Sequence, residues 1–447
     1  MTYTEELSRF IKGARIEDFP SDVIEVAHKC VLDWIGVTLG AVGDPAVALL
    51  KDTMLEMGGN EQASVLGYGS RVTMANAALV NGMMAHILDY DDAHSGVRTH
   101  PSAPLVPAIL AVGEYIGCSG RDLVEAFVVG CEVTLRVGYA LGKNYYEKGW
   151  HATSILGRFG AAAGASRLFG LTADQVSMAL GLAATQAGGL RDAFGTMTKP
   201  FHSGRAAMDG LLSALLARRG FTAPVNILDP GSGFARLFSP DYEPDRLLRG
   251  LGTDFETLGV NFKPYAACLL VHPVIDGLIM LRDQNGLDPG AIDEINLSIA
   301  PLNLQVTDNA APIDGLHAKF SLQMAAALAL TYGRATESLF TDKMVHDPRI
   351  IALMGKVKAV ADDALSETEA VINLVLQDGQ EYSIHIEAPK GDPRNPLTFE
   401  DIAKKARDLS ATVISDRVFD EVMDLTDHLE ELDTIVTLVH LCCPDRR

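Results

Sequence analysis

The sequence VINLVLQDGQEYSIHI at residues 371–386 predicts a β-hairpin in a chain whose other segments are mostly helical in pattern. Its two arms, residues 371–376 and 382–386, are rich in apolar and β-branched residues, and Asp378-Gly379 lies between them. Asp-Gly is favoured in tight hairpin turns because glycine adopts positive φ without steric cost. This segment therefore predicts that at least one part of the chain contains a sheet.

The rest of the chain shows helical periodicity on both sides of this sheet-containing part. From the start to about residue 260, apolar residues recur at steps of three and four, as along residues 23–35. Thr172 and Ser119 stand at N-terminal capping positions, the first for a helix over 173–187. Helical periodicity returns over 398–447, after the Pro- and Gly-rich stretch 389–396.

Between these helical parts, the residues at 295–299 alternate between apolar and polar and indicate a strand with one buried face. Helical patterns are predicted around 318–332 and 348–360. We therefore predict a mainly α fold. Its all-helical large domain comprises residues 1–260 and 396–447, and a smaller α+β domain, residues 261–395, is inserted into it.

Composition limits the classes of function. The chain has 447 residues, 48% of them hydrophobic, and a formal net charge of −21. This length and composition predict two or three units with a large core. The acidity argues against a nucleic-acid partner, which needs a basic face, and there is no basic stretch for an anionic membrane surface. We find no signal peptide, no apolar run of about eighteen residues, and six scattered cysteines, so we expect a soluble, cytoplasmic protein.

Common catalytic motifs are absent from the sequence, namely GxxxxGK[ST], strand-initiated GxGxxG, HExxH and GxSxG. Four polar clusters within apolar helical sequence remain to be explained. The first is HILDYDDAHSGVRTHPSAP at 86–104. Its titratable residues are Asp89, Asp91, Asp92, His94, Arg98 and His100. A solvated loop between helices is the alternative, and the spacing fits no defined metal-ligand pattern.

The second cluster is YYEKGWHATSILGRFG at 145–160, in which His151 precedes Thr153, Ser154 and an apolar helix. A helix N-terminus with hydroxyl groups suits a carboxylate ligand, although a structural histidine at a capped helix start is an equal alternative.

The third cluster is GTMTKPFHSGRAAMDG at 195–210. Lys199, His202 and Arg205 are spaced by three residues at the start of a helix, so they are expected on one face. The small and apolar neighbours favour a cleft over a surface cluster. The fourth cluster, FKPYAACLLVHPVIDG at 262–277, brings Lys263 to the predicted domain boundary, where small-molecule sites are common.

Five segments in order, LDYDDAH…THPSAP, GWHATS, TKPFHSGRAA, KPYAAC and GLHAKFSL (315–322), resemble the MmgE/PrpD family over most of the chain. The resemblance implies an all-helical domain built from both chain ends, with the α+β domain as a lid. It also implies an active site in the cleft, a homodimer, and no metal, nucleotide or organic cofactor. Members include 2-methylcitrate dehydratase, cis-aconitate decarboxylase and iminodisuccinate epimerase.

The resemblance points to active-site positions at Asp89, His100, His151, Lys199 and Lys263. The sequence departs from the dehydratase and decarboxylase pattern at Ala93, where those members usually carry Thr, and at Ala266, where Pro is common. Because an epimerase needs no leaving-group acid, these departures favour an epimerase of iminodisuccinate-type substrates over a hydro-lyase or a cis-aconitate-type decarboxylase.

All three reactions share an enolate-like intermediate beside a carboxylate, which needs a base and positive charge. We expect Lys199 to act as the base and Tyr145 as the second proton donor, with His100 or His151 in that role for a lyase. Substrate carboxylates are expected to bind among the remaining groups, which are Asp89, Arg98, His202, Arg205 and Lys263. A non-catalytic helical binding protein is the alternative from another class.

Overall fold

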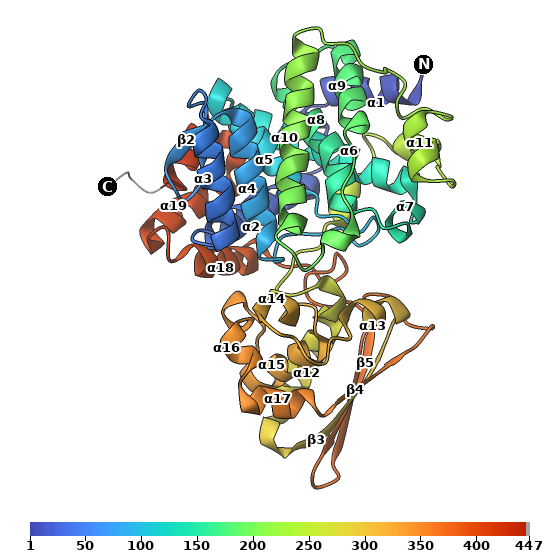
Figure 1. The fold of residues 1–447 in the computed structure, drawn as a ribbon, viewed down its shortest axis with the longest axis vertical. Helices are drawn as coiled ribbons and strands as arrows, with labels where there is room; N and C mark the ends of the chain where they lie inside the picture. Colours follow the sequence, from blue (N-terminus) through green and yellow to red (C-terminus); the bar gives the residue numbers. More distant parts are fainter. Residues whose placement is uncertain (444–447) are drawn as a thin grey trace. The chain divides into compact units, whose positions relative to one another are not determined.

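The computed structural model describes residues 1–443 and divides into two compact units (Figure 1). The helical unit comprises residues 1–261 and the described residues from Thr398 onward, so it is built from both parts of the chain that show helical periodicity. The mixed unit comprises Phe262–Leu397. The fold is mainly α, as predicted.

The helical unit is a set of helices packed around a core of small and aliphatic side chains. Helix α8 packs against α6 and α10, and α10 also packs against α4 (Figure 1). The helices of this unit are α1 (Tyr3–Gly13), α2 (Ser21–Gly40), α3 (Pro45–Met57), α4 (Met74–Ile87), α5 (Ser102–Ile116), α6 (Gly120–Leu141), α7 (Asn144–Glu147), α8 (Ala152–Leu168), α9 (Ala173–Thr185), α10 (Thr198–Arg218), α11 (Gly233–Phe238), α18 (Phe399–Ser410), α19 (Asp416–Asp427) and α20 (Val436–Leu441).

The predicted helix starts are confirmed by their caps. The Thr172 hydroxyl accepts from the Gln175 N–H at 3.3 Å, and the Gln175 side chain accepts from the Thr172 N–H at 3.0 Å. Ser119 and Asp122 form the same reciprocal cap on α6. These bonds satisfy N–H groups that the helix itself leaves unpaired. The helical pattern predicted over 398–447 is confirmed as far as α20, and residues 444–447 lie outside the described part of the chain.

Two glycines let α4 and α10 approach each other closely. A Cβ atom on Gly82 would lie 2.7 Å from the Gly204 Cα, and a Cβ atom on Gly204 would lie 2.0 Å from the Leu79 carbonyl oxygen. Neither distance is compatible with a side chain, so the glycines set the separation of the two helix axes.

The helical unit is not all-helical. Strands β1 (Ala63–Val65) and β2 (Ser70–Val72) pair antiparallel in a small sheet, with Ala63 opposite Val72. The prediction missed them because strands of three residues are too short to show alternation.

The mixed unit contains a four-stranded sheet in the order β4-β3-β5-β6. Its strands are β3 (Ile292–Ile299), β4 (Val357–Ala361), β5 (Ala370–Leu376) and β6 (Glu381–Ile386), and only the β3–β4 pair is parallel. The predicted hairpin is β5–β6, with Gly379 at φ 85° in its turn, and the predicted strand is β3.

Helix α12 (His272–Asn285) packs on β5 and β6, and α15 (Leu322–Tyr332) packs on α12 and on α17 (Pro348–Met354). The other helices of the unit are α13 (Pro301–Thr307), α14 (Gly315–Ala318) and α16 (Asp342–Val345). The helix predicted over 348–360 was wrong in its second half. There the chain leaves α17 at Gly355 and pairs with β3 as β4, so a tertiary partner overrides the local pattern.

Within residues 1–443, no single helix is long and apolar enough to cross a membrane. Helices α2 and α3 meet the length and composition test only when taken together, and they are bent by 92°. All six cysteines are free thiols.

Candidate active site

Three of the predicted clusters meet inside the helical unit. We call His86, Asp91, His100, His151 and His202 the histidine cluster. His86 lies in the last turn of α4, Asp91 and His100 lie in the loop before α5, His151 directly precedes α8, and His202 lies near the start of α10. The rings form a continuous series, because His86 contacts both His100, at a centroid distance of 4.6 Å, and His151, at 6.0 Å.

Asp91 joins two of these histidines through one carboxylate oxygen. Its Oδ2 atom lies 2.8 Å from His86 Nδ1 and 3.1 Å from His100 Nδ1. His100 Nδ1 also lies 2.7 Å from the Asp92 carbonyl oxygen. Because both oxygens can only accept, His100 carries its proton on Nδ1. Its Nε2 atom is therefore left with a lone pair when the ring is neutral.

His151 and His202 form a second pair, with their Nδ1 atoms 3.1 Å apart. One of these nitrogens must donate and the other accept, so the two rings hold complementary tautomers. The Phe194 ring packs edge-on against His151 at 5.1 Å and shields it from water. The histidine expected near the start of α8 is thus a buried member of the cluster.

Lys199, in the first turn of α10, forms an ion pair with Asp89. Lys199 Nζ lies 3.1 Å from Asp89 Oδ1, and both side chains are nearly buried, with 11% and 6% exposure. Asp89 has a φ of 51°, in the left-handed region that non-glycine residues rarely adopt. Such strain persists where the surroundings hold a residue in place, and it is common at functional sites.

Burial makes most of the histidines weak bases. It lowers the pKa of His86 to about 4, although Asp91 opposes the shift. It also lowers the pKa of His151 well below its usual value, reinforced by His86, Lys199 and His202. Burial raises the pKa of Asp91, but His100 and His86 outweigh it and hold that pKa well below the ordinary range. At neutral pH the site thus holds an ionised Asp91 beside neutral His86 and His151, so these two imidazoles do not supply the positive charge expected from the sequence.

Asp92 holds the same loop in place through its hydrogen bonds with Ser102. Its carboxylate accepts from the Ser102 hydroxyl and from the Ser102 N–H at 3.3 Å, while its carbonyl accepts from His100. Burial raises the pKa of Asp92 to about 7. Its side chain ties the loop to the start of α5, which fixes the carbonyl that His100 contacts.

Tyr145 is not suited to the role of second proton donor. Its hydroxyl donates to the Val97 carbonyl oxygen at 3.1 Å, and the side chain is buried. Burial also raises its pKa. The segment at 144–147 forms the short helix α7, and the buried ring of Tyr145 makes its role as a second proton donor a prediction that the geometry does not favour.

The other predicted ligands have different surroundings. Arg205 is partly exposed and pairs with Asp209 at 3.0 Å, one turn along α10, so the three cations of this segment do not converge. The Arg98 guanidinium lies over the Tyr146 ring at 5.1 Å, with a φ of 52° at Arg98. Lys263 belongs to the mixed unit, and its role as a carboxylate ligand stays a prediction.

The sequence analysis missed His86 and did not assign a role to Asp91. His86 ends a helix that is apolar on all sides, where a histidine reads as a core residue. The signal that was available is its position at the head of the same segment, five residues before Asp91. Only the turn of the chain at Leu88 and Asp89 brings the two side chains together.

His86, Asp91 and His100 also form the one group of three metal-type ligands found among residues 1–443. Their ligand atoms lie within 4.8 Å of one another. In the structure the two nitrogen–oxygen distances are those of hydrogen bonds, and a metal ion would have to replace both Nδ1 protons. The arrangement shown is therefore that of two oriented imidazoles.

Comparison with known proteins places both units in one family. Residues 5–247 match the model of the MmgE/PrpD N-terminal domain, and residues 265–428 match that of the MmgE/PrpD C-terminal domain. The chain is 28% identical to cis-aconitate decarboxylase from Aspergillus terreus, over 99% of this chain and 96% of the relative. It is also 28% identical to human cis-aconitate decarboxylase, over 98% and 94%.

A more distant relative is 2-methylcitrate dehydratase from Escherichia coli strain K12, which is 24% identical over 83% of this chain and 82% of the relative. The two domain matches together cover both units of the structure. The chain therefore belongs to the MmgE/PrpD family.

Proposed function

We propose that this protein is a lyase that acts on a small polycarboxylic acid through a carbanion-like intermediate beside a carboxylate. The observation that carries the proposal is the contact of Asp91 with His86 and His100. It leaves the His100 Nε2 lone pair available, and the His100 side chain is 16% exposed whereas that of His86 is fully buried. His100 is therefore the member of this pair that a ligand can reach.

The Lys199–Asp89 pair supplies the complementary group. An ion-paired ammonium is a charged donor, so Lys199 is better suited to stabilise developing negative charge or to deliver a proton than to act as the base expected from the sequence. For a reaction that removes an α-proton, we assign the base role to His100, because an imidazole that carries its proton on Nδ1 accepts one at Nε2.

Decarboxylation is the first reaction that we propose, because the relatives matched over nearly the full chain are cis-aconitate decarboxylases. In this reaction the bond to the departing carboxylate breaks, and its electron pair stays on carbon and is delocalised onto the neighbouring carboxylate. The Lys199 ammonium then delivers a proton to carbon, and solvent restores it.

Epimerisation remains a second proposal, and a specific feature favours it. Ala93, where the dehydratase and decarboxylase pattern has Thr, has no side-chain hydroxyl, and its backbone is fixed by paired hydrogen bonds with Asn261 at 2.7 and 2.9 Å. In this reaction His100 Nε2 takes the α-proton and the Lys199 ammonium returns one to the opposite face. Lys263 and the substrate-binding role of Asp89, Arg98 and His202 belong to both proposals, as does a cytoplasmic homodimer that needs no added cofactor.

The experiment is proton NMR of a panel of di- and tricarboxylic acids with the protein in deuterated water. Loss of carbon dioxide with deuterium at the new carbon supports the decarboxylase, and a new alkene without loss of carbon supports a dehydratase. Exchange of the α-hydrogen with inversion and no other product supports the epimerase. Binding of these acids by calorimetry, without reaction or exchange, would overturn the proposal in favour of a non-catalytic binding protein.

A further inference from the structure

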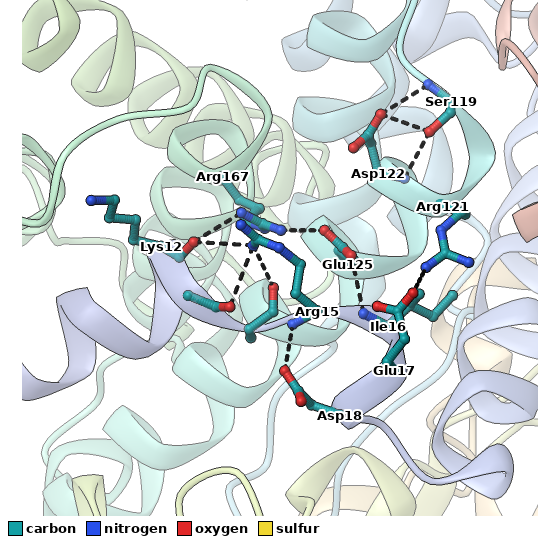
Figure 2. Close-up of polar contacts among 12 residues, drawn as sticks. Lys12, Arg15, Ile16, Glu17, Asp18, Ser119, Arg121, Asp122, Glu125 and Arg167 are labelled. Atoms are coloured by element: carbon teal, nitrogen blue, oxygen red, sulfur yellow. Dashed lines mark hydrogen bonds and ion pairs between the residues drawn. The ribbon is translucent and has the colours of Figure 1, made fainter.

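A polar hollow lies in the helical unit, at the end of α8 opposite His151. Its volume is about 500 Å³, and it is formed where the residues after α1 meet the end of α5, the start of α6 and the end of α8. Its charged lining consists of Arg15, Arg121, Arg167, Glu17, Asp122 and Glu125 (Figure 2). Helix α8 has 17 residues and is therefore about 25 Å long, so this hollow is distinct from the histidine cluster.

Two of the arginines are held side by side. Arg15 Nη1 donates to the Lys12 carbonyl oxygen at 3.3 Å, and Arg167 Nη1 donates to the same oxygen at 2.9 Å (Figure 2). Bringing two guanidinium groups to one atom costs electrostatic energy, which an anion bound in the hollow would offset. In a chain with a net charge of −21, two adjacent arginine side chains are a local exception to the overall negative charge.

The acidic residues of the hollow differ in how firmly they are engaged. Glu125 is buried, pairs with Arg167 and accepts from the Ile16 N–H at 3.0 Å. The Asp122 carboxylate accepts from the N–H and the hydroxyl of Ser119 in the cap of α6. Glu17, 67% exposed, pairs with Arg121, which is itself 47% exposed. Exposed pairs of this kind contribute little free energy and exchange readily for a better ligand.

Arg15 has different partners from Arg121 and Arg167, which pair with carboxylates. The bonds of its side chain run to the Lys12, Gly13 and Ala14 carbonyl oxygens, at 3.1 to 3.3 Å, and no carboxylate is among these partners. Arg167 Nε is also buried without a hydrogen-bond partner among the described residues. The hollow thus contains guanidinium N–H groups whose bonding is weak or incomplete, and such groups bind phosphate and carboxylate oxygens strongly.

We propose that this hollow is a binding site for a small polyvalent oxyanion, with Arg15 and Arg121 as its principal ligands and Glu17 displaced from Arg121 on binding. Arg167, kept in place by Glu125, closes the far side. The proposal concerns a site apart from the histidine cluster and does not depend on the proposed reaction.

The test is isothermal titration calorimetry of the full chain with pyrophosphate and, in a separate arm, with citrate. Saturable binding of pyrophosphate alone identifies a phosphate-bearing ligand, and stronger binding of citrate identifies a polycarboxylate. The double variant Arg15→Gln/Arg121→Gln should weaken binding at least about tenfold, because two charge-assisted contacts are lost. Glu17→Gln should tighten it severalfold, an effect that misfolding cannot imitate.

A matched control is available on α19, where Arg417 and Glu421 form another exposed ion pair. Glu421→Gln changes the net charge by the same amount as Glu17→Gln, and Arg417→Gln removes one of the two positive charges that the double variant removes. Both should leave the affinity unchanged. The proposal is overturned if neither anion binds at concentrations up to about 10 mM, or if the double variant binds as well as the unmodified protein. Equal effects of the α19 variants would likewise show that only overall charge is being measured.

Discussion

Asp91 accepts from the Nδ1 atoms of both His86 and His100 through a single oxygen, so one buried carboxylate orients the two rings. We expect Asp91→Asn to lower kcat by about 10² to 10⁴-fold, because an amide group can donate as well as accept and no longer enforces the tautomer. Turnover and its pH profile report this change. KM should change much less than kcat, since the substrate ligands remain.

Asp92→Asn is the control for this variant. The pKa of Asp92, raised by burial to about 7, leaves a large fraction of its carboxyl neutral in the folded protein, so an amide is a near isostere. We expect turnover within a few-fold of the unmodified protein. Equal losses of kcat for Asp91→Asn and Asp92→Asn would mean that neither orients a reacting group.

The second prediction concerns the Lys199–Asp89 pair. Lys199→Met should abolish both turnover and exchange of the substrate α-hydrogen with deuterated water, because the charged donor is lost. It should also destabilise the protein by about 3 to 5 kcal/mol, because a nearly buried carboxylate loses its ion-pair partner. Isotope exchange by NMR and denaturant unfolding measure the two effects.

Arg136→Met separates these effects. Arg136 and Glu132 form another buried pair in the helical unit, with Nε and Oε2 2.8 Å apart. This variant should be destabilised to a similar extent but keep isotope exchange under conditions where it is folded. Wild-type exchange by Lys199→Met would eliminate Lys199 from the reaction.

The third prediction follows from the position of Tyr145. Tyr145→Phe should keep turnover of both stereoisomers of a chiral substrate within about twofold and lose about 1 kcal/mol of stability, the typical value for one hydrogen bond. Steady-state kinetics and thermal unfolding test it. A large fall in kcat with unchanged stability would restore Tyr145 as a proton donor.

The fourth prediction is that stability rises as pH increases from about 4 to about 6.5. Burial lowers the pKa values of His86 and His94 to about 4, so in this range the unfolded chain binds their protons and the native protein does not. His151 acts in the same direction. Asp92 and Glu132 oppose them, because burial raises the pKa of Asp92 to about 7 and also raises that of Glu132, but two groups do not outweigh three.

His94 provides the test of this balance, because it lies outside the hydrogen-bonded cluster. His94→Gln should reduce the slope of the free energy of unfolding against pH by the amount that corresponds to about one bound proton. It should reduce the total loss of stability on acidification by on the order of 3 kcal/mol. Denaturant unfolding at a series of pH values measures the slope. An unchanged slope would show that His94 is protonated in the folded protein.

The fifth prediction concerns metal. Dialysis against a chelator should leave turnover unchanged, because the Nδ1 atoms of both imidazoles already lie at hydrogen-bond distance from Asp91 Oδ2. Elemental analysis of the purified protein provides the second measurement. One firmly bound metal ion per chain, removed together with activity and restored with it, would contradict this expectation.

Much of the fold was predictable because its signals are local. The capping residues Thr172 and Ser119, and the Asp378-Gly379 turn, specify where helices and a hairpin begin or reverse. Strand β4 was not predictable in this way, because its pairing with β3 joins residues 62 positions apart at Ile295 and Val357. Local pattern alone does not contain such a partner.

The candidate site was predictable as a set of segments but not as a set of contacts. Lys199, His100 and His151 were expected in one place and lie in the same buried region. The partners of these residues were not foreseen, because Asp91 and Asp89 reach them only after the loop folds back from α4. The charge of the site was misjudged for the same reason, since burial, and not sequence, sets the protonation of the histidines.

The crossing of α4 and α10 at Gly82 and Gly204 has a consequence for engineering this protein. His86 follows Gly82 by four residues, and Lys199 and His202 precede Gly204 on the opposing helix. The close approach of the two backbones therefore sets the spacing between these side chains of the candidate site. Libraries aimed at longer or shorter acids should keep both glycines fixed and vary the rim instead. A helix separation that is set by backbone contact cannot be adjusted gradually, because any side chain at either glycine would clash with the opposing helix.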